Sequence, residues 1–149
     1  MIPDKSTPVP NIILDAFLPI LKPAELAVLL VIIRQTLGWQ DGTRPSRKQR
    51  DWISGTQLQS KTGCSRKSIS TAIDSLQSQG LISVFDEYRR KLDSPHERQG
   101  KLRLYYAFIG EKAVENRGIP QHTCVKSSLN LSNYYAQQKK LLQKKLSYH

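Results

Sequence analysis

Residues 54–82, SGTQLQSKTGCSRKSISTAIDSLQSQGLI, decide the fold. Within them, Ser65 is followed by apolar side chains at positions 69, 72, 73 and 76, which is the spacing of one face of an α-helix. The Ser65 hydroxyl can accept a hydrogen bond from a free N–H group of the first turn, so we expect it to cap this helix. Gly80 can adopt the left-handed conformation that ends a helix. The pattern therefore predicts a capped, amphipathic helix over residues 65–79.

A shorter helix precedes this one, with a tight bend between the two. Leu58 anchors the expected helix over residues 57–62, and Gly63 and Cys64 form the bend. A free cysteine suits a bend of this kind, where a small apolar side chain is usually buried. Two helices joined by a glycine-containing turn, the second with a basic and hydroxylic outer face, are typical of a helix-turn-helix.

A β-hairpin is expected directly after the second helix. Residues 81–88 predict one strand, and residues 101–109, KLRLYYAFI, predict another by their period of two. The polar stretch between them, RRKLDSPHERQG, forms a long tip. A hairpin in this place is a wing. The predicted fold class is therefore mainly α with a small β-hairpin (α+β): a winged helix-turn-helix with an N-terminal helical extension and a C-terminal helical tail.

The N-terminal part predicts an arm and two helices. Residues 1–10 contain three prolines and no periodicity, which indicates an extended arm. The next segment predicts a short helix over residues 11–18, whose inward side chains are Ile13, Leu14, Phe17 and Leu18. The most apolar helix is predicted over residues 24–37, with Pro23 suited to its first turn, and should be the scaffold for the other elements. Trp39 is expected to fold back on it, and residues 52–53 predict a single short strand.

The chain thus divides into the arm (1–10), a winged-helix domain (11–110) and a C-terminal extension (111–149). The extension contains a predicted helix over residues 131–146 that has lysines and no acidic residue. Three roles remain open for it: a helix docked on a partner or a dimer mate, a nucleic-acid-binding tail, or a segment that is disordered when alone. We prefer the first, in which residues 129–146 contact a second copy or a larger protein assembly.

The charge balance points to a polyanionic partner. The formal net charge is +11 and the isoelectric point is near 9.9, which favours nucleic acid over a membrane surface. The alternative is that the excess charge only maintains solubility. The chain begins without a signal-peptide pattern, and its longest apolar run, residues 26–33, is too short to cross a bilayer. Two cysteines make no disulfide framework, so we expect a cytoplasmic protein with no membrane partner.

The positions of the polar side chains assign roles in binding double-stranded DNA. The first turns of a recognition helix reach base edges in the major groove, and the outward residues there are Arg66, Lys67, Ser70 and Thr71. Phosphate contacts are expected from Thr56, Gln57, Ser65, Arg44, Arg47, Lys48 and Arg50. The wing would add Arg89, Arg90, Lys91, Arg98, Lys101 and Arg103.

Each assignment has a plainer alternative. The basic loop over residues 40–51 can be a solvated connector, and single wing charges can contact protein instead of DNA. Asp74 could accept a hydrogen bond from cytosine, or hold Arg66 or Lys67 in place.

No arrangement for catalysis or metal binding can be placed on the chain. His96 is expected to be exposed in the hairpin tip, and His122 with Cys124 lacks the second pair of ligands of a zinc site. A phosphate-binding glycine loop, a nucleophile elbow and paired carboxylates are absent from the sequence. We therefore expect a protein that is not an enzyme and has no cofactor or metal.

Two segments resemble a known family. TPVPNIILDAFLPILKPAELAVLLVIIRQTLGW (residues 7–39), followed by DWISGTQLQSKTGCSRKSISTAIDSLQSQGLI (residues 51–82), is similar to the N-terminal winged-helix domain of phage replication protein O. The matching positions are Val9, Pro10, Asn11, Gly38, Trp39, Ser54, Leu58, Thr62, Gly63, Ser65, Arg66, Leu76, Gly80, Leu81 and Ile82. The resemblance implies a sequence-specific binder of duplex DNA, often dimeric, that marks an origin and recruits replication machinery through a separate C-terminal segment. This chain differs in its long basic loop and its short C-terminal part.

Two functions follow as hypotheses. The first is a sequence-specific DNA-binding protein in replication initiation or transcriptional control. The second is a non-enzymatic adaptor that uses the winged helix and the basic tail to hold a protein or ribonucleoprotein assembly together. Replacing Arg66 by alanine should reduce discrimination between target and random duplex only in the first case.

Overall fold

The computed structural model describes residues 6–39 and 47–110, which form a mixed α+β fold. Its small antiparallel sheet has three strands in the order β1-β3-β2. The elements in chain order are a π-helix η1 (Ile13–Phe17), α1 (Pro23–Thr36), β1 (Asp51–Trp52), α2 (Gly55–Thr62), α3 (Arg66–Ser78), β2 (Ile82–Phe85), α4 (Pro95–Arg98) and β3 (Tyr105–Phe108). The helix expected over residues 131–146 and the first half of the arm lie outside the described residues.

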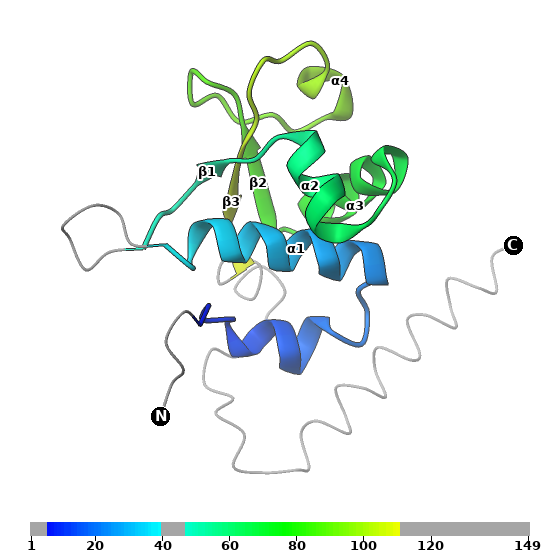
Figure 1. The fold of residues 1–149 in the computed structure, drawn as a ribbon, viewed down its shortest axis with the longest axis vertical. Helices are drawn as coiled ribbons and strands as arrows, with labels where there is room; N and C mark the ends of the chain where they lie inside the picture. The colour runs from blue at the N-terminus through cyan, green and yellow to red at the C-terminus, as the bar shows by residue number, and fades with distance from the viewer. Residues whose placement is uncertain (1–5, 40–46, 111–149) are drawn as a thin grey trace, which may run out of the picture. The chain divides into compact units, whose positions relative to one another are not determined.

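Helix α1 forms the centre of the core, as its composition predicts. Val28, Leu29, Ile32 and Ile33 are completely buried, and α1 contacts α2, α3 and β3. Figure 1 shows α1 running between η1 on one side and the pair α2 and α3 on the other. Burial of these four aliphatic side chains makes α1 a large source of hydrophobic stabilisation among the described residues.

Helices α2 and α3 form where the caps and the apolar stripe predict them. The Ser54 hydroxyl accepts a hydrogen bond from the backbone N–H of Gln57 (3.1 Å) and caps α2. Gly63 ends α2 in the left-handed conformation, with φ of 69°. The Ser65 hydroxyl accepts from the N–H of Ser68 (3.2 Å) and caps α3. The whole predicted stripe of α3 is buried: Ile69, Ala72, Ile73 and Leu76.

The prediction for the first helix was wrong in part. Ile13, Ala16 and Phe17 are buried, but Leu14 and Leu18 are 51% and 44% exposed. The cause is the wider winding of η1, in which the N–H of Leu18 donates to the carbonyl of Ile13, five residues earlier (2.8 Å). This winding moves Leu14 and Leu18 off the face that a regular α-helix would bury.

The sheet has one face directed toward α1. Val84 and Tyr106 are paired neighbours on β2 and β3 and are buried on that face, and Asp51 of β1 pairs with Tyr106 on its other side. Gln35 of α1 donates a hydrogen bond to the Asp51 carboxylate (3.2 Å). Alternate residues of each strand point to the opposite face. The short strand predicted over residues 52–53 exists one residue earlier, as β1, and forms one edge of the sheet.

The predicted hairpin is shorter and more structured than expected. The strands are Ile82–Phe85 and Tyr105–Phe108, and Leu102, which the period-two pattern placed in a strand, is 83% exposed. The chain reverses immediately after β2, where the N–H of Leu92 donates to the carbonyl of Val84 (2.9 Å). The tip then forms α4, capped by Ser94, whose hydroxyl accepts from the N–H of Glu97 (3.3 Å).

Candidate nucleic-acid interface

The exposed face of α3 carries the residues predicted to read bases. Its members, all exposed, are Arg66, Lys67, Ser70 and Thr71. The side chains of Arg66 and Lys67 form no hydrogen bond or ion pair with any described residue, and the Thr71 hydroxyl donates to the carbonyl of Lys67 (3.1 Å). The buried stripe on the other side of α3 fixes which residues face outward, so both cations are held at the surface in the first turn.

Of the polar groups expected to bind phosphate, two are already used as helix caps. The hydroxyl of Ser65 caps α3 and lies 2.9 Å from the hydroxyl of Ser68. Gln57 forms a capping box with Ser54, in which its amide oxygen accepts from the N–H of Ser54 (3.0 Å). Thr56 is exposed in the first turn of α2, where backbone N–H groups have no acceptor within the helix. Thr56 is thus the group of this set that is best placed to meet an anion.

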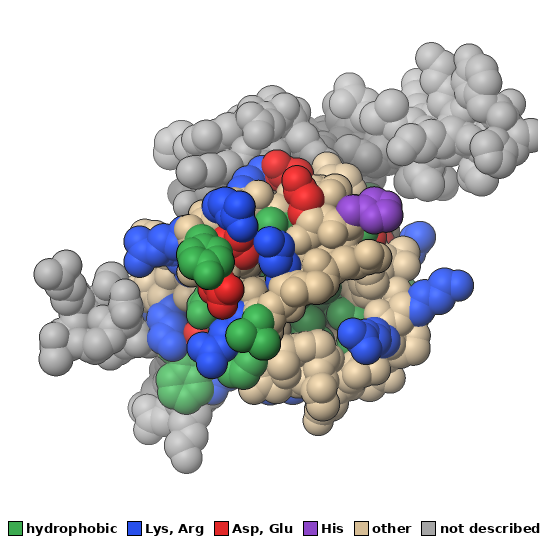
Figure 2. Space-filling view, turned by 90° about the horizontal axis from the view of Figure 1, so that it is seen from above, with side chains coloured by type: hydrophobic (Ala, Val, Ile, Leu, Met, Phe, Trp, Pro, Cys, Tyr) green, Lys and Arg blue, Asp and Glu red, His purple; other side chains and the backbone are tan. Residues whose placement is uncertain are grey.

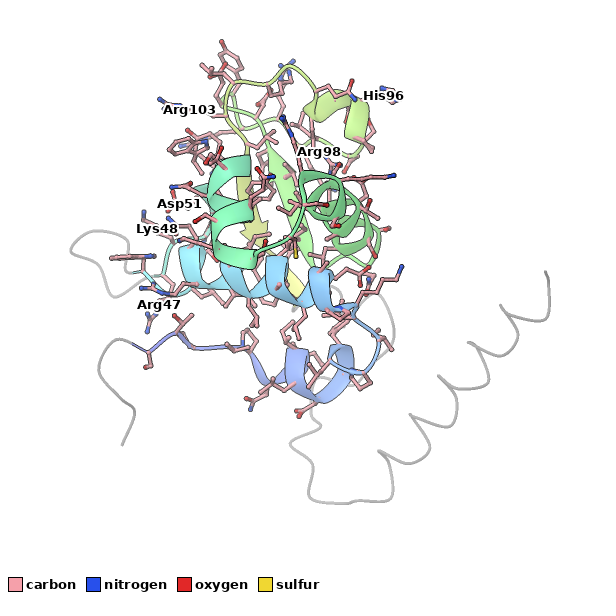
Figure 3. The ribbon with its side chains drawn as sticks, turned by 45° about the vertical axis from the view of Figure 1, so that its right-hand side comes forward. Arg47, Lys48, Asp51, His96, Arg98 and Arg103 are labelled. Atoms are coloured by element: carbon pink, nitrogen blue, oxygen red, sulfur yellow. The ribbon has the colours of Figure 1, made fainter. Side chains whose placement is uncertain are left out.

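The basic loop before β1 is tied to the protein by the cations that the structure describes. Arg47 donates to the carbonyl of Leu37 (3.1 Å), and Lys48 forms an ion pair with Asp51 (3.1 Å). Arg50 lies over the ring of Phe85, 5.7 Å from its centre. Arg44 lies outside the described residues. Figure 3 shows Arg47, Lys48 and Asp51 on the same side of the molecule. Each of these three cations has a partner within the protein, and their contact with phosphate stays a prediction.

Arg98 has a different role from the one expected of a wing cation. Its side chain is only 8% exposed and forms an ion pair with Asp74 of α3, and it also donates to the side chain of Gln77. Figure 3 shows Arg98 between α4 and α3, while His96 points outward. Burial lowers the pKa of the Arg98 guanidinium from its ordinary range. This ion pair joins α4 to α3, and we call it the Asp74–Arg98 latch. Arg98 therefore does not face a ligand, and Asp74 pairs with it instead of with Arg66 or Lys67.

A buried carboxylate organises the turn after β2. Asp86 is 2% exposed and accepts hydrogen bonds from the N–H groups of Tyr88 and Arg90 and from Nε of Arg90, each at 2.9 Å. Lys101 lies 3.8 Å from the same carboxylate. Burial alone would raise the pKa of Asp86, but the hydrogen bonds and the charge of Arg90 outweigh it and hold the pKa below its ordinary value. The turn places Arg89 in the left-handed region, with φ of 67°.

The other wing cations remain at the surface. The side chain of Arg89 has no partner among the described residues, and Lys91 pairs with Asp93 at 2.9 Å, both of them more than half exposed. Arg103 lies over the ring of Trp52, 5.4 Å from its centre. Figure 2 shows basic side chains interspersed with hydrophobic and acidic ones on the side where Figure 1 draws β1. Exposed ion pairs are weak, so these cations can exchange their partners for phosphate.

Two features near this interface were not predicted from the sequence, the short helix α4 and the ion pair between Asp74 and Arg98. The capping box at Ser94 and Glu97, with a proline between them, is a readable signal for α4. The pair between Asp74 and Arg98 has no local signal, because 24 residues separate its partners.

Among the described residues no three potential metal ligands lie together, and none of the helices in 6–39 and 47–110 is long and apolar enough to cross a membrane. Cys64 is free and half-buried.

Comparison of the chain with protein-family models, with curated proteins and with solved structures gave no match in any of the three.

Proposed function

We propose that residues 11–110 form a winged helix-turn-helix and that the protein binds double-stranded DNA selectively, as an initiator of replication or a regulator of transcription. One observation carries the proposal: α3 buries one complete stripe and presents Arg66 and Lys67 free in its first turn. The resemblance to the N-terminal domain of phage replication protein O agrees with this function but depends on sequence motifs alone.

In this proposal, α3 enters the major groove by its N-terminal turns. Arg66 donates two hydrogen bonds to O6 and N7 of one guanine, which is the commonest specific contact between an arginine and a base. Lys67 contacts a neighbouring base or a phosphate. Ser70 and Thr71 lie one turn later on the same face, where a hydroxyl can donate to or accept from a base edge.

The flanking elements supply phosphate contacts and orientation. The first turn of α2 presents Thr56 to the backbone on one side of the groove, and Arg89 reaches the backbone from the turn after β2. Such contacts fix the register of the protein on the duplex and make its affinity depend steeply on salt. The latch from Arg98 to Asp74 holds the segment after this turn against α3, so that both parts of the interface meet one duplex.

The test compares two variants that remove the same charge. With a duplex chosen by selection, Arg66→Ala should lower discrimination by about 1–3 kcal/mol at one base pair. Lys22 is exposed just before α1 and is not one of the residues assigned to the interface, so Lys22→Ala should weaken binding to all duplexes equally and leave the preference intact. Fluorescence anisotropy at several salt concentrations measures both effects. Equal behaviour of the two variants would contradict the proposal.

A further inference from the structure

The face of the sheet that points away from α1 carries a row of three aromatic side chains. Trp52 of β1 is paired with Tyr105 of β3, and Tyr105 is paired with Phe85 of β2. Directly paired residues of neighbouring strands share a face. Their sequence neighbours Asp51, Tyr106 and Val84 occupy the face toward α1, so the aromatic row Trp52–Tyr105–Phe85 lies on the other one.

The aromatic row is accessible and is flanked by arginines. Trp52 is 39% exposed, and Tyr105 and Phe85 are half-buried. Arg103 covers the ring of Trp52 and Arg50 covers the ring of Phe85, at 5.4 and 5.7 Å from the ring centres. Figure 2 shows hydrophobic side chains exposed among basic ones on the side where β1 lies.

The open part of this face is limited to the row itself and the wing beside it. Ser83 and Ala107, the next residues along the same face, are buried. In the other direction the strands lead to the turn after β2 and to the segment before β3, where Tyr88 is 74% and Leu102 is 83% exposed. The Lys101–Asp86 contact at 3.8 Å brings these two segments together.

We infer that the aromatic row binds the unpaired bases of single-stranded nucleic acid. Aromatic rings and guanidinium planes both stack on bases, and the same guanidinium groups neutralise the phosphates between them. Bases in a duplex are already stacked on one another and cannot enter such a row. The aromatic row contains no residue of α3, and the arginines beside it, Arg50 and Arg103, are the only groups that it shares with the predicted duplex contacts.

Charge favours this ligand over an apolar partner protein. An apolar protein surface that covered the row would remove Arg50 and Arg103 from water without an opposite charge, which is costly. A strand of nucleic acid supplies one phosphate for each base and compensates both arginines. The chain as a whole carries a formal charge of +11, which also attracts a polyanion.

Tryptophan fluorescence can measure ligand binding at the aromatic row, because the chain has two tryptophans and one of them, Trp52, belongs to the row. In Trp39→Phe, Trp52 is the sole tryptophan, and an oligothymidylate of about 12 nucleotides should quench its fluorescence in a saturable manner. Heparin, which has charge but no bases, should not. Trp52→Phe keeps a ring and should retain affinity, while Trp52→Thr keeps a β-branched residue on the strand and should bind the oligothymidylate about 5- to 100-fold more weakly.

Binding of one variant, Arg66→Ala, to oligothymidylate and to duplex separates this site from the duplex site. Arg66→Ala should bind oligothymidylate as tightly as the unmodified chain, whatever it does to duplex binding. If Trp52→Thr does not fold, Tyr105→Val tests the same row, and circular dichroism verifies the fold of each variant. Equal quenching by heparin, failure to bind oligothymidylate, or unchanged affinity of the variants that fold would overturn the inference.

Discussion

The latch between α3 and α4 gives an asymmetric prediction, because its two partners differ in exposure. The side chain of Arg98 is 8% exposed, whereas that of Asp74 is 38% exposed. Removing one partner of a buried ion pair costs about 3–5 kcal/mol, because the other charge stays buried alone. In Asp74→Ala, Arg98 retains Gln77 as a partner, and the removed carboxylate was partly solvated, so we expect a loss of about 2–3 kcal/mol.

Arg98→Met should cost less than Asp74→Ala. The methionine retains much of the apolar stem, and the freed Asp74 can bind water at its exposed side, so we expect a loss of about 1 kcal/mol. The double variant removes both charges together and should lose less than the sum of the two single variants, by about 1–2 kcal/mol of coupling.

Urea unfolding followed by circular dichroism measures these differences. With a slope of about 1–3 kcal/mol per molar urea, Asp74→Ala should move the midpoint by about 1 M or more. Equal losses in the two single variants, or losses that simply add in the double variant, would refute the assignment of Arg98 as a buried latch.

Three further predictions concern single residues. The pKa of Asp86 is lowered in the folded protein, so its contribution to stability is complete above its ordinary pKa of 3.8 and is lost as the pH falls through the lowered pKa. The difference in urea midpoint between the unmodified chain and Asp86→Asn should therefore shrink below about pH 4. Burial raises the pKa of Tyr106 to about 12, so its contribution to stability is intact below about pH 10. On the order of 2–3 kcal/mol of that stability should be lost as the pH rises toward 12. In thermal unfolding at the same pH values, Tyr106→Phe should lack this loss. Gly63 has φ of 69° and open space around an added Cβ, so Gly63→Ala should lower stability by about 1–2 kcal/mol, whereas Gly55→Ala, which meets no atom within 4 Å and has no positive φ, should be neutral or slightly stabilising.

The sequence predicts the parts of this fold that depend on local patterns. The cap at Ser65, the apolar stripe of α3 and the left-handed glycine at position 80 all lie within one helix and its ends, where spacing and side-chain chemistry determine the outcome. The α+β class is confirmed as well, because the longer helices and the strand pair β2 and β3 each leave a local pattern in the sequence. The winged-helix topology stays a prediction.

Features that depend on contacts between distant segments could not be predicted. Arg98 looks like any exposed cation in the sequence, and only the approach of α4 to α3 buries it. Leu102 fits the alternation of a strand, but the strand begins later, at Tyr105, because β2 offers pairing partners only from Ile82 to Phe85. The aromatic row was likewise hidden, because its three members come from three strands and meet only through the register of the sheet.

Selection of bound duplexes from a random pool, run in parallel with the unmodified chain and with Arg66→Ala, tests the central claim most directly. If the first turn of α3 reads bases, the unmodified chain should enrich one sequence motif, and Arg66→Ala should lose the preference at one position of that motif and keep the rest. A pool that stays random for the unmodified chain, or the same complete motif from both proteins, would contradict the reading of DNA by α3.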